Sequence, residues 1–138
     1  MKVLIIDGQG GHLGGQLIKD IHKNFANAEI TAIGTNAVAT ATMLKAGADA
    51  AATGENPVIV ACRKADVIIG PIGIVIADSL LGEVTPKMAV AIGQADARRI
   101  LIPVNKCENQ VAGVTNLTMT VLIEDVLTKL KAAYGCEM

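Results

Sequence analysis

The sequence predicts a three-layer α/β domain of the Rossmann type, built on a mainly parallel sheet of about five strands. Short aliphatic runs alternate with segments of helical periodicity, which implies parallel strands joined by right-handed crossovers. The apolar half of the composition is almost wholly aliphatic, with one Phe, one Tyr and no Trp among 138 residues, as suits buried parallel strands. We expect residues 1–138 to form a single domain. A flavodoxin-like strand order is the alternative, because periodicity does not separate the two.

Five short apolar runs are predicted as strands, each bounded by turn residues. In chain order they cover residues 3–6, 29–33, 49–53, 66–70 and 99–104. Residues 105–115 are predicted as a loop, with a short extra strand at Val111 as a further option.

Helices between these strands are predicted from apolar spacing. Residues 11–24 carry one apolar face, formed by Leu13, Leu17, Ile18 and Ile21. The last helix has a similar face, formed by Leu117, Val121, Leu122, Val126, Leu130 and Ala133. Residues 73–81 are ambiguous between helix and loop.

Capping signals give the starts of four helices. Asn36, Asn56, Thr85 and Asn116 are N-cap residues, and the second and third are followed by proline, which is favoured in a first turn. The first three of these helices are expected to extend to about residues 45, 64 and 95.

A glycine-rich turn, IIDGQGGHLGG at residues 5–15, joins the first strand to the first helix. A helix start offers free N–H groups and a dipole that attract anions, and glycine lets a phosphate approach the backbone. The Lys and Ser/Thr of a Walker loop are missing, and Leu13 breaks the strict G-x-G-x-x-G pattern. The spacing Gly8-x-x-Gly11-x-x-Gly14 resembles the loop of extended short-chain dehydrogenases, epimerases and some NAD(P)-dependent reductases.

We therefore expect a phosphate-bearing ligand, most simply the dinucleotide NADP or NAD, at this loop. The alternative is a tight turn without a ligand, in a non-enzymatic interaction or regulatory module. The loop residues expected to bind are Gly8, Gln9, Gly10, Gly11, His12, Leu13 and Gly14.

Two further strand ends should lie on the same edge of the sheet. The second strand ends at Gly34-Thr35-Asn36, without the carboxylate that NAD-binding proteins usually place there for the ribose hydroxyls. Thr35 and Asn36 are therefore candidate ligand contacts, and NADP is expected to bind at least as tightly as NAD. The fourth strand leads into Gly70, Pro71 and Gly73, near the expected switch point.

Candidates for catalysis are few, and the sequence leaves open whether the protein is an enzyme. His12 is a phosphate contact or an exposed residue at a helix start. Asp78 and Ser79 interrupt an apolar run, as functional groups or as one polar side of a helix. Cys107 is a reactive thiol, a metal ligand together with His12, or a plain loop residue, and the spacing does not support the metal. No metal-type Cys/His spacing and no Tyr-x-x-x-Lys pair is present.

Composition and charge indicate which classes of partner to expect. The net charge is −1 and 1% of residues are aromatic, so nucleic-acid binding is not expected. The most membrane-like stretch, residues 67–81, is shorter than the roughly 20 residues a bilayer span needs. Three widely spaced cysteines suit reduced thiols, so we expect a cytoplasmic protein. Low charge, 18% against a usual value of about 25%, and the apolar run at 73–81 predict a homo-oligomer.

Four segments together carry a resemblance that covers nearly the whole chain. They read IDGQGG, IGTNAVATATMLKAGADAAATGEN, DVIIGPIGIVIADSLLGEVTPKMA and ILIPVNKC. They resemble a family of small bacterial proteins, mostly clostridial, that is classed as a domain of unknown function. The resemblance implies a stand-alone cytoplasmic Rossmann-like domain and carries over no catalytic residues.

Overall fold

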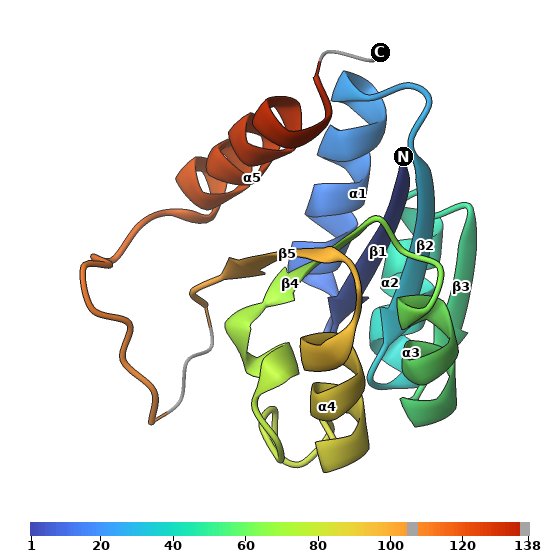
Figure 1. The fold of residues 1–138 in the computed structure, drawn as a ribbon, viewed down its shortest axis with the longest axis vertical. Helices are drawn as coiled ribbons and strands as arrows, with labels where there is room; N and C mark the ends of the chain where they lie inside the picture. The colour runs from blue at the N-terminus through green and yellow to red at the C-terminus, as the bar shows by residue number, and fades with distance from the viewer. Residues whose placement is uncertain (105–107, 136–138) are drawn as a thin grey trace.

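The computed structural model describes residues 1–104 and 108–135, and in it five strands form one parallel sheet (Figure 1). The strands are β1 (Lys2–Asp7), β2 (Glu29–Gly34), β3 (Ala50–Thr53), β4 (Val67–Pro71) and β5 (Arg98–Ile102). Their order is β3-β2-β1-β4-β5, and all four neighbouring pairs are parallel. This is the Rossmann order and not the flavodoxin order, so the expected fold class is confirmed.

Helices cover both faces of the sheet. They are α1 (His12–Asn24), α2 (Ala37–Lys45), α3 (Glu55–Cys62), α4 (Pro86–Gln94) and α5 (Met119–Tyr134), with a short 3₁₀ helix η1 (Ile72–Val75) after β4. Val3 and Ile5 of β1 pack with α1, α2 and α5, whereas Leu4 and Ile6 pack with α3, α4 and η1. The alternation of side chains along the central strand thus divides the core into two layers.

The helix caps agree with the sequence at two positions and differ at two others. The side chains of Asn36 and Thr85 accept hydrogen bonds from the N–H groups of Ala39 and Met88, as predicted. Helix α3 instead begins at Glu55, because the chain turns at Gly54, where φ is 101°. The predicted cap at Asn56 is therefore wrong.

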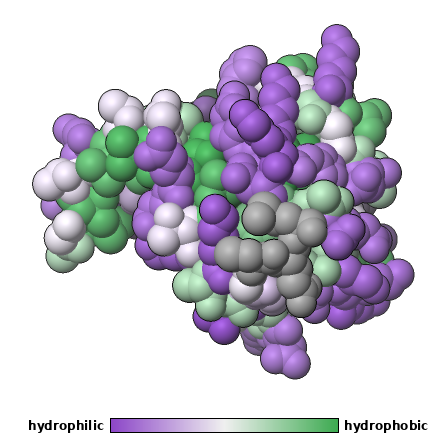
Figure 2. Space-filling model, turned by 90° about the horizontal axis from the view of Figure 1, so that it is seen from above, coloured by the Kyte–Doolittle hydropathy of each residue, from purple (hydrophilic) through white to green (hydrophobic). Residues whose placement is uncertain are grey.

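Helix α5 also begins later than predicted. Thr118 is its N-cap and accepts from the N–H of Val121, so the expected cap at Asn116 is wrong. Leu117 and Val121 are exposed. The buried face is formed by Leu122, Ile123, Val126 and Leu130. Seen from above, hydrophilic side chains cover most of the surface, and hydrophobic surface is exposed mainly at the left, where Figure 1 shows α5 and the segment before it (Figure 2).

The ambiguous segment after β4 is neither one helix nor an open loop. It forms η1 and then a series of turns in which Asp78, Leu80 and Leu81 have positive φ. Ile74 and Leu80 are buried in the core under α4. Within the run at 73–81, Gly73, Ile74 and Leu80 are buried, whereas Leu81 is 101% exposed. The apolar surface of this run is therefore only partly covered, and the homo-oligomer expected from it stays a prediction.

Residues 108–118 contain no strand, so the extra strand considered at Val111 is not formed. Within the described ranges 1–104 and 108–135, no helix combines the length and the hydropathy needed to cross a membrane.

Candidate functional site

The carboxyl ends of β1, β2 and β4 bring three segments together at one edge of the sheet. The first is the glycine loop, residues 8–14, which follows β1 and enters α1. The second is Thr35-Asn36 after β2, and the third is the segment 72–85 after β4. In the order β3-β2-β1-β4-β5, the chain reverses direction across the sheet between β1 and β4, and ligands of such sheets bind outside this switch point.

A buried carboxylate holds the glycine loop. Asp7, the last residue of β1, is 5% exposed. Its Oδ1 accepts from the N–H of Gly8 and its Oδ2 from the N–H of Gly14, both at 2.8 Å. Burial raises the pKa of this carboxyl, and the two backbone hydrogen bonds oppose the rise without cancelling it. The side chain thus joins the central strand to the first turn of α1.

Close packing accounts for two glycines of the loop. Gly11 has φ 75°, and a Cβ there would lie 2.7 Å from the carbonyl oxygen of Ala39 in α2. A Cβ at Gly14 would overlap the side chain of Met43, also in α2. The start of α1 therefore lies against α2 so closely that only glycine fits at these two positions.

Two N–H groups at the start of α1 remain available. The first residues of a helix have no intrahelical acceptor for their N–H groups. Asp7 takes the N–H of Gly14, and the N–H of Gly15 bonds to the carbonyl of Gly11. Within the described part of the chain, no hydrogen bond is made by the N–H of His12 or of Leu13. These two donors are suited to an anion.

Glu83, from the segment after β4, places a carboxylate at the end of β2. Its Oε1 accepts from the hydroxyl of Thr35 at 2.6 Å and from Nδ2 of Asn36 at 3.1 Å. A Cβ at Gly8 would lie 3.1 Å from the same oxygen, so the carboxylate also lies against the glycine loop. The carboxylate missing from the sequence of β2 is thus supplied from elsewhere in the chain.

The charge of Glu83 is stabilised where it stands. The hydrogen bond from Thr35 is the largest effect and lowers the pKa of Glu83. Desolvation by burial opposes it less strongly, and bonds from Asn36 and from the N–H of Gln9 lower the pKa further. Asn36 links the pieces, because its Oδ1 caps α2 while its Nδ2 donates to Glu83 and to the carbonyl of Gln9.

The end of β4 is close to the loop but is shaped by packing. A Cβ at Gly70 would overlap the carbonyl oxygen of Ile6 in β1. The carbonyl of Gly73 accepts from the hydroxyl of Ser79, and Pro71 is buried. The side chain of Leu80 covers Gly8, where a Cβ would lie 2.7 Å from Leu80 Cδ1. The predicted residues at 70–73 therefore border the glycine loop through Leu80.

The remaining candidates for chemistry are not assembled into a reactive site. Ser79 is engaged with Gly73, and Asp78 is an exposed turn residue. The ring of His12 is exposed at the start of α1. Cys107 lies outside the described residues. In the described ranges, no group of three or more His, Cys, Asp or Glu residues could hold a metal ion.

Residues 2–135 match the family described as domain of unknown function DUF3842. The chain belongs to that family. No curated protein matches it.

Asp7 can be tested by an isosteric substitution. In Asp7→Asn, the amide group turns a donor towards the N–H of Gly8 or Gly14, and one buried donor loses its acceptor. We expect the free energy of unfolding to fall by about 1–3 kcal/mol in urea denaturation at pH 7. Asp125→Asn, on the exposed surface of α5, is the matched control and should change stability by less than about 0.5 kcal/mol. Equal stability of the two variants would contradict the role given to Asp7.

Glu83 predicts a dependence of stability on pH. Because its folded pKa lies below the ordinary value of 4.5, its contribution is present above pH 4.5 and is lost as the pH falls through the folded pKa. The variant Glu83→Gln lacks this contribution. The difference in unfolding free energy between wild type and variant should therefore shrink on acidification below pH 4.5. A difference that stays constant from pH 7 downwards would show that Glu83 is not held by these bonds.

Proposed function

We propose that this DUF3842 protein binds a nucleotide at the glycine loop, with NAD or a similar dinucleotide carrying a free ribose diol preferred over NADP. One observation carries the proposal: the carboxylate of Glu83 lies beside Gly8 and the end of β2. In Rossmann domains, a carboxylate at that place accepts hydrogen bonds from the adenosine ribose.

The phosphate end of the proposal rests on the start of α1. Among the described residues, the N–H groups of His12 and Leu13 have no hydrogen-bond acceptor, and they belong to the helix that follows the central strand. A pyrophosphate beside them would benefit from the helix dipole and from two charge-assisted hydrogen bonds. The ring of His12 lies against Gly10, where a Cβ would be 2.9 Å from it.

At the ribose end of the ligand, the structure favours NAD over NADP, which reverses the cofactor preference expected from the sequence. NADP was expected to bind at least as tightly as NAD because Gly34-Thr35-Asn36 contains no carboxylate. Glu83 supplies one, hydrogen-bonded to Thr35 and Asn36. A carboxylate can accept about four hydrogen bonds. Thr35, Asn36 and Gln9 already donate to Glu83, which leaves room for one donor such as a ribose hydroxyl, whereas the charge repels a 2′-phosphate.

A second candidate function is an interaction module that uses the loop only as a turn. Asp7 already neutralises part of the helix start, and Leu80 covers Gly8. Both contacts would serve a packed turn without any ligand. The two functions differ in whether a phosphate-bearing ligand stabilises the protein.

Thermal denaturation against NAD, NADP, FMN, ATP and AMP tests the phosphate site. A ligand at 100 times its Kd should stabilise the fold by roughly 2.7 kcal/mol. In His12→Asp a carboxylate stands beside the two free N–H groups, and it should abolish this shift while leaving the unliganded protein folded, since Asp is favoured in a first turn. Substitution at Gly11 would not serve, because any Cβ there overlaps Ala39.

Lys23→Ala, an exposed position near the other end of α1, is the control for His12→Asp, because it lowers the net charge by the same amount. It should retain the thermal shift. No shift in the wild-type protein with any of the five compounds would favour the interaction module.

Cofactor preference tests Glu83. Titration calorimetry should give tighter binding of NAD than of NADP to the wild-type protein. In Glu83→Gln, affinity for NAD should fall roughly tenfold or more, as loss of a charged acceptor costs about 1.5–3 kcal/mol, and the preference over NADP should narrow. Glu29→Gln, exposed at the opposite end of β2, should leave both affinities unchanged. Tighter binding of NADP to the wild type would contradict the assignment of Glu83.

A further inference from the structure

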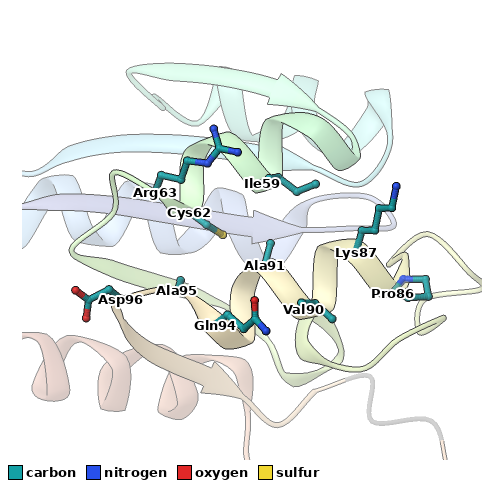
Figure 3. A pocket seen from close by; sticks show the side chains of 10 residues that line it. All are labelled: Ile59, Cys62, Arg63, Pro86, Lys87, Val90, Ala91, Gln94, Ala95 and Asp96. Carbon is teal, nitrogen blue, oxygen red and sulfur yellow. The ribbon is translucent and has the colours of Figure 1, made fainter.

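An apolar part of the surface lies between α3 and α4, away from the glycine loop (Figure 3). It is a groove of about 680 Å³ whose apolar lining includes Ile59, Val90 and Ala91. Val90 is 53% exposed, although its neighbours Met88 and Ile92 are fully packed in the core. Helix α4 therefore has two apolar sides, and the core uses only one of them.

The groove-facing side of α4 has unlike charges at its two ends. Lys87, Val90, Ala91 and Gln94 recur at the spacing of one helix face and line the groove, with Asp96 just past the end of the helix. Lys87 and Asp96 lie at opposite ends of the groove (Figure 3). The midpoint between them along the chain falls beside Ala91, whose side chain is small and apolar.

The same reversal of charge occurs along α3. Glu55 is the first residue of that helix, lies just outside the groove lining, and accepts a hydrogen bond from the hydroxyl of Thr85. Arg63 follows the last residue of the helix and lines the groove, with Ile59 midway between the two charges. Consider a two-fold axis that lies in the interface, perpendicular to α3 and α4 and level with their midpoints. It would place the positive end of each helix over the negative end of the same helix in the second copy. A symmetric interface requires such self-complementarity, because the same surface patch is used by both copies.

We propose that this groove is the interface of a symmetric homodimer, in which α4 lies antiparallel against α4 of a second copy. Val90 and Ile59 form its apolar centre, and Lys87 pairs with Asp96 of the partner subunit at both ends. The occupant is a second copy of this chain because each helix has opposite charges at its two ends. An antiparallel copy of the same helix therefore brings unlike charges together. The proposal is independent of nucleotide binding, since it uses neither the glycine loop nor Glu83.

Sedimentation velocity of the full chain is the first test. The wild-type protein at roughly tens of micromolar should sediment as a dimer of the 14.2 kDa chain. Val90→Glu places two carboxylates near the axis and should raise the dimer Kd at least about tenfold. Val38→Glu, also an exposed helical valine but on α2, should leave it unchanged. A monomeric wild type, or a dimer insensitive to Val90→Glu, would overturn the proposal.

Charge exchange gives a sharper test that does not depend on one apolar residue. Lys87→Glu alone and Asp96→Lys alone should each weaken the dimer by about tenfold, because two like-charge contacts replace two attractive ones. The double variant Lys87→Glu/Asp96→Lys restores opposite charges and should recover the wild-type Kd. Recovery would be specific to an antiparallel contact between copies. Additive loss in the double variant would overturn the antiparallel arrangement.

Discussion

The buried carboxylate of Asp7 is the contact on which the carboxyl edge of the sheet depends. It ends the central strand and holds the N–H groups of Gly8 and Gly14, so the turn between β1 and α1 has one geometry. With the turn held, Gly11 and Gly14 lie against α2, and Thr35 donates its N–H to the carbonyl of Asp7. The ends of β1 and β2 are thereby joined, and Asn36 and Glu83 can meet across the loop.

The same contact limits what the loop can bind. A helix start that faced solvent with all its N–H groups free would be a strong anion site, but here one donor is taken by an internal anion. The remaining donors, from His12 and Leu13, are next to each other, which suits one phosphate group and not an extended cradle. Affinity for a dinucleotide would thus depend on its sugar end as well, where Glu83 lies.

Features that depend on neighbouring residues could be predicted from the sequence, whereas features that depend on tertiary contacts could be predicted only in part or not at all. Aliphatic strands, the apolar face of α1 and the caps Asn36 and Thr85 depend on neighbouring residues, and they were predicted. The order of the strands depends on tertiary pairing, so the sequence predicted the fold class and left a flavodoxin-like strand order as the alternative. Glu83 was missed because it is 48 residues from Thr35, and neither its type nor its spacing marks it. Only the turns after η1, with their positive φ values, bring it to β2.

The two carboxylates at this edge are held in opposite ways, and that difference bears on ligand charge. Hydrogen bonds keep the pKa of Glu83 low, so it stays ionised and suits a neutral hydroxyl partner. Burial raises the pKa of Asp7, so its charge is the less stable of the two. A phosphate on the N–H groups of His12 and Leu13 would stand beside Asp7 and raise that pKa further, since a nearby like charge disfavours ionisation. Under the proposed function, the phosphate end of the ligand would therefore act on the pKa of Asp7, whereas the ribose end would lie beside Glu83, whose ionised form is already stabilised by hydrogen bonds.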